Sequence, residues 1–210
     1  MKKAILFDLD GTLWDSSPQV LAAWNQCIKE ELHRQEQFTL AQMHSYMGRT
    51  IGQIAAMMFP DVPEEVRCGY LDRCTKAEYA YLKHHTATLY PQSETVIRSL
   101  AEQYTLGIVS NCLEGYIPCY LAQCGFAECF SDFECAGHTG KPKGENIRLV
   151  VERNHITDCI YVGDTQGDAD AAAFAGVKFV HAAYGFGTIT ACDAAISTIT
   201  ELPAVAAKLL

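Results

Sequence analysis

The sequence predicts an α/β fold in which helices cover both faces of a doubly wound parallel sheet, with an all-helical segment inserted near its start. Short continuous apolar runs, such as Ala4–Phe7 and Ile160–Val162, are typical of strands that are buried on both faces of a parallel sheet. From residue 89 onward, such runs alternate with segments of helical periodicity, whereas residues 15–87 contain no good strand candidate.

The first strand is expected to end at Asp8, and the all-helical segment follows it. This segment opens with Asp15-Ser16-Ser17-Pro18, where a hydroxyl cap and a proline in the first turn are typical of a helix start. Apolar residues at helical spacing then predict four helices, at about 17–32, 39–47, 51–59 and 63–81. The segment leaves the sheet after one strand and returns before the next, so its two ends should lie close together.

The rest of the chain is expected to alternate between strands and helices. The predicted strands are 106–109, 133–135, 159–162, 177–182 and 194–198. The predicted helices are 96–103, 117–124, 146–154, 169–175 and a closing helix from 203. We therefore expect two domains, a sheet core of residues 1–14 and 88–210 and a helical domain of residues 15–87.

The composition is that of an ordinary globular protein, with 210 residues, 49% hydrophobic and 20% charged. The net charge of -9 argues against a nucleic-acid partner, which would require a basic face. No apolar run approaches the length of a membrane-spanning helix, and the run after Met1-Lys2-Lys3 is too short for a signal peptide. We expect a cytoplasmic protein without a nucleic-acid or membrane partner, either a monomer or a small homo-oligomer.

The 10 cysteines form no Cys-x-x-Cys pair. Cys119, Cys124 and Cys129 recur every five residues without a histidine partner, which does not fit the usual spacing of zinc ligands. In a reducing compartment we expect free thiols that behave as small hydrophobic side chains.

Four short polar motifs lie at or near the ends of predicted strands. They are Asp8-Leu9-Asp10-Gly11-Thr12, Ser110-Asn111, Lys141-Pro142-Lys143 and Gly163-Asp164-Thr165-Gln166-Gly167-Asp168. Ligands of open α/β sheets bind just beyond the carboxyl ends of the strands. Four carboxylates, a serine, a threonine and a lysine are therefore expected to meet at one edge of the sheet.

Taken together and in this order, the motifs resemble those of the haloacid dehalogenase superfamily, and within it the phosphatases of the phosphoglycolate phosphatase type. Asp8–Thr12 fits the first motif of that family, Ser110 the second, Lys141 or Lys143 the third and Gly163–Asp168 the fourth. The resemblance spans nearly the whole chain. It implies a Rossmann-like catalytic core with an inserted, mobile all-helical cap over the active site, and a static helical subdomain is the alternative for residues 15–87.

The first motif carries the two catalytic candidates. Asp8 is predicted to be the nucleophile, because a carboxylate can attack phosphorus and form an aspartyl-phosphate. Asp10 lies two residues on and is predicted to protonate the leaving oxygen and later to deprotonate water. Thr12 can donate hydrogen bonds to phosphate oxygens. The dehalogenases and phosphonatases of the superfamily lack the second aspartate, so Asp10 favours phosphate esters as substrates.

A second acidic pair, Asp164 and Asp168, predicts a metal ion, because a phosphate site would not gather this many carboxylates without a positive charge among them. Oxygen ligands of this kind suit Mg²⁺. The resemblance implies that Asp8, the backbone carbonyl of Asp10 and Asp164 hold the ion, with Asp168 in or beside its ligand shell. For Asp168, a cap on the following helix is the alternative.

The remaining candidates would bind the phosphate or the rest of the substrate. Ser110 can hydrogen-bond a phosphoryl oxygen, and the Asn111 amide can reach the nucleophile or the substrate. Lys143 is preferred to Lys141 as the phosphate-binding lysine, because it lies nearer the predicted start of a helix. Arg49 lies between two predicted helices of the cap, where it either binds a carboxylate or second phosphate of the substrate or is an ordinary surface arginine.

These observations predict a Mg²⁺-dependent phosphomonoester hydrolase that acts on a small phosphorylated metabolite through an aspartyl-phosphate intermediate. An intramolecular phosphotransferase resembling β-phosphoglucomutase is the first alternative, because it would share every core residue named here. A non-catalytic binding domain on the same fold is the second, although a binding module would have no need for both a nucleophile and an acid.

Overall fold

The computed structural model describes residues 2–210, which divide into two compact units. The sheet unit comprises the chain up to Asp15 together with Leu89–Leu210, and the helical unit comprises Ser16–Thr88. Within the described residues, no helix is both long enough and apolar enough to cross a membrane.

The sheet unit is built on six parallel strands in the order β5-β4-β1-β6-β7-β8. Their bounds are β1 (Lys3–Phe7), β4 (Thr105–Ser110), β5 (Phe130–Cys135), β6 (Asp158–Gly163), β7 (Lys178–Ala182) and β8 (Ala194–Ile196). The chain first builds outward from β1 to β5 and then continues on the other side of β1 from β6 to β8. Such a reversal creates the crevice in which open α/β sheets bind ligands. The predicted doubly wound parallel sheet is confirmed.

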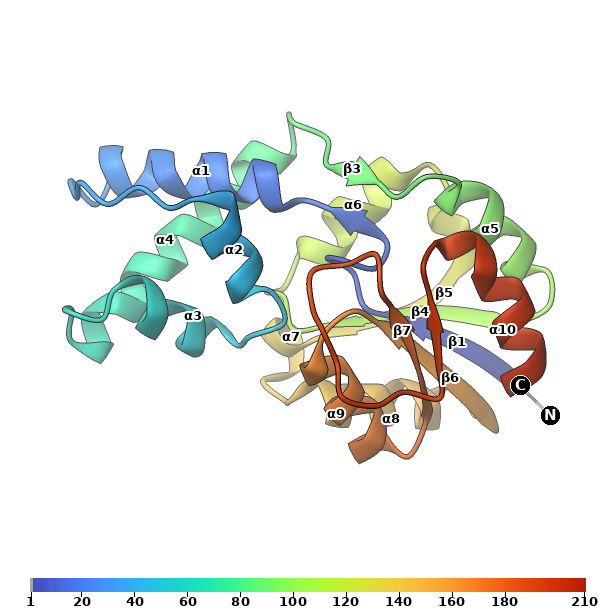
Figure 1. The fold of residues 1–210 in the computed structure, drawn as a ribbon. Helices are drawn as coiled ribbons and strands as arrows, with labels where there is room; N and C mark the ends of the chain where they lie inside the picture. The colour runs from blue at the N-terminus through green and yellow to red at the C-terminus, as the bar shows by residue number, and fades with distance from the viewer. Residues whose placement is uncertain (1) are drawn as a thin grey trace. The chain divides into compact units, whose positions relative to one another are not determined.

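Helices cover both faces of this sheet (Figure 1). One face carries α8 (Lys143–Arg153) and α9 (Gln166–Ala175), which enclose a core that includes Leu6, Ile147 and Tyr161. The helices of the other face are α5 (Ser93–Ala101), α6 (Tyr116–Cys124) and α10 (Leu202–Leu209). Short elements complete the unit, namely α7 (Ala136–Thr139), η1 (Ala127–Cys129) and η2 (Ile199–Glu201).

The helical unit has its own core. It contains α1 (Ser17–Glu30), α2 (Leu40–Tyr46), α3 (Ile51–Met58) and α4 (Glu64–Leu82), which confirms the four helices predicted from apolar spacing. Thr39 and Thr50 start α2 and α3 with capping boxes. Inside the unit, the Trp24 indole nitrogen donates a hydrogen bond to buried Glu78 at 2.7 Å.

Two very short strands, β2 (Trp14–Asp15) and β3 (Thr88–Leu89), pair where the chain leaves and re-enters the sheet unit. The backbone nitrogen of Tyr90 also donates to the Leu13 carbonyl at 3.5 Å. The two ends of the inserted segment therefore lie side by side, as the sequence predicted. A strand of two residues has no periodicity, so the pairing itself could not be predicted.

Several predicted helix starts were wrong by three residues. Helix α8 begins at Lys143 rather than Asn146, and α9 begins at Gln166 rather than Ala169. The first turn of α8 contains Gly144 and Glu145, and that of α9 contains Gly167 and Asp168, so neither turn shows an apolar repeat. Residues in extended conformation, Pro142 and Thr165, precede these turns and set where the helices begin.

Candidate active site

Asp8 at the carboxyl end of β1 meets Lys143 and Asp168, which lie in the first turns of α8 and α9. Asp8 follows β1 and extends its pairing with β6, because its backbone nitrogen donates to the Val162 carbonyl at 2.8 Å. The Lys143 Nζ lies 3.0 Å from Asp8 Oδ1 and 2.6 Å from Asp168 Oδ1. All three side chains are buried. One ammonium group therefore neutralises part of the charge of two carboxylates in a nearly dry environment.

Asp168 also caps α9, which is the alternative expected for this residue. Its Oδ2 accepts hydrogen bonds from the Thr165 backbone nitrogen at 2.9 Å and the Thr165 hydroxyl at 2.7 Å. The Thr165 side chain accepts in turn from the Asp168 backbone nitrogen, which completes a capping box. Oδ1 faces Lys143, so the two oxygens have separate partners.

Asp164 is enclosed by backbone. Its Oδ2 accepts from the Phe186 backbone nitrogen at 2.7 Å, whereas its buried Oδ1 has no hydrogen-bond partner within residues 2–210. A Cβ atom at Gly11, where φ is +83°, would lie 2.3 Å from Asp164 Oδ2. A Cβ atom at Gly185 would lie 2.3 Å from the Cβ of Asp164. Only glycine at these two positions lets the chain pass so close to this carboxylate.

The loop that contains Gly185 was missed in the sequence analysis. It follows β7, and besides its contact with Asp164 it places the Tyr184 hydroxyl 2.8 Å from the Thr12 carbonyl. The signal was available, because Tyr184-Gly185-Phe186-Gly187 follows the carboxyl end of a predicted strand, as the other motifs do. The loop acts through its backbone and one phenol, so a search for charged motifs passes over it.

The three buried aspartates could hold a metal ion. Asp8, Asp164 and Asp168 each offer a carboxylate oxygen, and these oxygens lie within 4.8 Å of one another. The partnerless Oδ1 of Asp164 is the observation that tests the fit, since a buried carboxylate oxygen is costly to leave without a donor or a cation. The donor set consists entirely of oxygen and fits a hard divalent cation.

The pKa values of the site residues, in the protein without a metal ion, agree with a cation site among the three aspartates. Burial raises the pKa of Asp8 to about 7, with the charge of Asp168 adding to the rise and Lys143 opposing it. Burial also raises the pKa of Asp164 to about 8, aided by the charges of Asp168 and Asp8. Burial lowers the pKa of Lys143, but Asp168 and Asp8 outweigh it and hold that pKa above its usual range. Burial and the repulsion between the carboxylates together therefore outweigh the effect of the one lysine on the pKa values of Asp8 and Asp164.

Thr12 and Ser110 lie at the same edge of the sheet. Thr12 is fully buried, and its hydroxyl has no hydrogen-bond partner among the described residues. Its backbone nitrogen donates to the Leu9 carbonyl at 3.2 Å, so the hydroxyl is the better phosphate donor. Ser110 is the last residue of β4, the strand next to β1, and Asn111 follows it directly.

Asp10 has a partner that the sequence analysis did not anticipate. The Tyr116 hydroxyl donates a hydrogen bond to Asp10 Oδ1 at 3.0 Å. Tyr116 is the first residue of α6 and is buried. A single aromatic residue at the start of a helix carries no motif, so only the folded chain reveals this contact.

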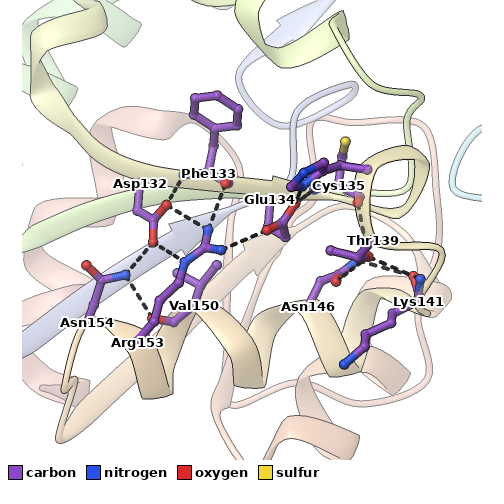
Figure 2. A network of polar contacts seen from close by, with 11 residues as sticks. Asp132, Phe133, Glu134, Cys135, Thr139, Lys141, Asn146, Val150, Arg153 and Asn154 are labelled. Carbon is purple, nitrogen blue, oxygen red and sulfur yellow. Dashed lines mark hydrogen bonds and ion pairs between the residues drawn. The ribbon is translucent and has the colours of Figure 1, made fainter.

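One of the predicted site residues of the sheet unit, Lys141, lies outside this cluster. Lys141 has a side chain that is 52% exposed, and its Nζ lies 3.9 Å from the exposed carboxylate of Glu145. The Thr139 hydroxyl accepts a hydrogen bond from the Lys141 backbone nitrogen at 3.1 Å, and the Asn146 amide donates to the Lys141 carbonyl at 3.2 Å. Figure 2 shows how these residues lie. Arg49 belongs to the helical unit, where its Nε donates to the Ser45 carbonyl at 3.0 Å. The geometry thus favours Lys143 over Lys141.

Comparison with known proteins identifies the family. Residues 5–182 match the family model described as haloacid dehalogenase-like hydrolase. The chain belongs to this family. It is 30% identical over 189 residues to a phosphoglycolate phosphatase of Xanthomonas campestris pv. campestris (strain 8004), with 88% of this chain and 84% of that protein covered. A phosphoglycolate phosphatase of Cereibacter sphaeroides is 30% identical over 182 residues, covering 83% of this chain and 82% of that protein.

The fold is shared with solved members of the haloacid dehalogenase-like hydrolases. A hydrolase of this family from Bacteroides fragilis superposes with a TM-score of 0.85 at 23% identity, covering 96% of this chain and 100% of that chain. The resemblance seen in the four motifs is confirmed, and so is the prediction of a phosphatase enzyme. A non-catalytic binding domain is therefore the wrong description of this chain.

Proposed function

We propose that this haloacid dehalogenase-like phosphatase is a Mg²⁺-dependent phosphomonoester hydrolase that acts on a small phosphorylated metabolite through an aspartyl-phosphate on Asp8. The observation that carries the proposal is the contact of Lys143 with both Asp8 and Asp168, beside the partnerless oxygen of Asp164. A phosphate dianion can approach a carboxylate nucleophile only where positive charge offsets their repulsion.

The metal would be held by Asp8 and Asp164, together with the backbone carbonyl of Asp10. Asp168 is better suited to a place beside the ion, because its two oxygens already accept from Lys143 and Thr165. When bound, Mg²⁺ shields the phosphate from the carboxylates and stabilises the charge that develops during transfer.

The reaction would proceed in two displacements at phosphorus. Asp8 Oδ attacks phosphorus in line and the bond to the leaving oxygen breaks, while Asp10 gives its proton to that oxygen. Asp10, now ionised, takes a proton from the water that attacks the phosphorus atom of the aspartyl-phosphate; the bond from phosphorus to the Asp8 oxygen breaks, and inorganic phosphate leaves. Lys143, Thr12 and Ser110 would bind the phosphoryl oxygens, and the Asn111 amide would reach the nucleophile or the substrate.

The substrate is expected to be small and acidic. The curated relatives named above are phosphoglycolate phosphatases, so 2-phosphoglycolate is the first compound to test. We also propose that the helical unit acts as a cap and that Arg49 binds a carboxylate or second phosphate of the substrate. A cytoplasmic location of the protein is part of the same proposal, because all 10 cysteines are free thiols, as expected in a reducing compartment.

Phosphate release by the purified protein with Mg²⁺ tests the proposal directly. 2-Phosphoglycolate and a panel of sugar phosphates should yield inorganic phosphate with at least one member, and Asp8→Asn should reduce that rate by at least about 10³-fold, since an amide cannot attack phosphorus. A rapid acid quench should trap phosphate on the peptide that contains Asp8. A sugar-phosphate isomer formed without phosphate release would instead establish a phosphotransferase.

A further inference from the structure

The loop after β1, which carries Asp10, packs against Tyr116, and Tyr116 binds the Asp10 carboxylate. The loop after β1 folds back on itself, because the Gly11 backbone nitrogen donates to the Trp14 carbonyl at 2.9 Å. The Trp14 ring packs edge-to-face on Tyr116, with centroids 5.7 Å apart, and Tyr116 donates to Asp10 Oδ1. The loop that carries Asp10 therefore also supports the residue that binds its carboxylate.

The start of α6 places Tyr116 against this loop. Gly115 adopts φ 93° just before the helix and turns the chain into it. The Tyr116 side chain is 2% exposed, so its hydroxyl has little access to solvent and its orientation is set by packing. A buried hydroxyl with a carboxylate acceptor is a directional contact that limits rotation of the acceptor.

We propose that Tyr116 is a positioning residue, which holds Asp10 so that its other oxygen, Oδ2, carries the proton for the leaving group. The inference rests on the proposed function, in which Asp10 is the general acid. A phenol that donates to Oδ1 keeps the transferable proton on Oδ2. The same hydrogen bond stabilises the carboxylate that forms once the proton has left, because a donor favours the charged form of its acceptor.

The dependence of rate on the leaving group tests this role. kcat/KM reports the steps up to phosphorylation of Asp8, so it is measured with Mg²⁺ over a series of aryl phosphates of rising leaving-group pKa. Tyr116→Phe removes only the hydroxyl and keeps the ring contact with Trp14. We expect a loss of about tenfold for the poorest leaving groups and within about threefold for 4-nitrophenyl phosphate, since one hydrogen bond to a charged group is lost.

Two further variants separate positioning from structural support. In an Asp10→Asn background, Tyr116→Phe should cause no additional loss, because the hydroxyl acts through the Asp10 carboxylate. Tyr120→Phe is the matched control: Tyr120 lies on the same helix, its ring packs on the same Trp14 at 5.1 Å, and its hydroxyl neighbours Cys124. Tyr120→Phe should leave the whole series unchanged.

The outcomes distinguish this inference from the proposed function. A partly unfolded variant loses the same factor on every ester, so only a steeper dependence on leaving-group pKa supports the positioning role. Equal losses across the series, or a further loss in the Asp10→Asn background, would overturn the role of Tyr116 and leave the proposed hydrolase intact. A wild-type protein that releases no phosphate from any ester would overturn both.

Discussion

Lys143 occupies the first residue of α8, where the positive end of the helix dipole disfavours a cation. It is also almost completely buried, which adds the cost of removing an ammonium from water. Only the two carboxylates in contact, Asp8 and Asp168, make this placement stable. A residue that breaks a local preference in this way is typical of a functional site.

Exchange of the two lysines for methionine should separate their roles. Lys143→Met removes the charge between Asp8 and Asp168 but keeps most of the side-chain volume, so kcat/KM for phosphate release should fall by at least about 10²-fold. Lys141→Met should remain within about twofold of wild type, because the Lys141 ammonium is exposed. Its ion pair with Glu145 is much weaker than the buried ion pairs of Lys143. Steady-state kinetics measure kcat/KM for both variants. If Lys141→Met were the variant with the large loss, Lys141 would be the phosphate-binding lysine.

At the scale of elements, strand β5 and helix α8 are joined by a network of charged groups (Figure 2). The Arg153 guanidinium contacts both oxygens of Asp132 at 2.7 Å and Glu134 Oε2 at 2.8 Å. His138 Nδ1 lies 2.8 Å from the other oxygen of Glu134. β5 is an edge strand of the sheet, and these contacts fix it against the helix that positions Lys143.

This network should make stability depend on pH. Burial raises the pKa of Glu134, but the hydrogen bonds from His138 and Arg153 outweigh it, so the pKa lies below the ordinary value of 4.5. Ionised Glu134 therefore stabilises the fold above about pH 4.5, and this contribution is lost as the pH falls through the folded-state pKa. Glu134→Gln should lower the free energy of unfolding by about 1–3 kcal/mol at pH 7, and the difference from wild type should shrink toward pH 3.

Urea unfolding at a series of pH values measures this difference. Glu152→Gln changes an exposed acid on the same helix, so it should remain within about 0.5 kcal/mol of wild type at every pH. A Glu134→Gln deficit that stays constant from pH 7 to pH 3 would show that its charge does not stabilise the network.

The strands, the helices and the acidic residues of the site were predictable because each leaves a periodic or local pattern in the sequence. The apolar runs located β1, β4 and β6, and the rule that ligands bind beyond strand ends located Asp8, Ser110 and Asp164. The contact between Tyr116 and Asp10 was not predictable, because it joins residues 106 positions apart without a shared motif. Helix starts were missed where the first turn is polar and only the capping geometry defines it.

At the scale of the whole molecule, the buried acidic cluster should couple metal binding to stability. At ten times its Kd, Mg²⁺ would stabilise the fold by about 1.4 kcal/mol, which for a chain of this size raises Tm by about 3–6 °C. Asp164→Asn should lose most of this shift. Without Mg²⁺, the same variant should melt at or above the wild-type Tm, because one of three mutually repelling carboxylates has been removed.

Thermal melting with and without Mg²⁺ follows both effects without an activity assay. NaCl at matched ionic strength is the control for charge screening. NaCl should not reproduce the difference in Tm shift between wild type and Asp164→Asn that Mg²⁺ produces. An equal Mg²⁺-dependent shift in wild type and Asp164→Asn would remove Asp164 from the metal site.

The pairing of β2 with β3 has an evolutionary consequence. It joins the chain ends on either side of the helical segment, so the sheet unit is closed at this point whatever lies between them. The entropic cost of closing a loop rises only slowly with its length, and here the strand pair fixes the ends in any case. Ancestral chains could therefore have gained, lost or exchanged the inserted segment while the fold of the sheet unit stayed intact.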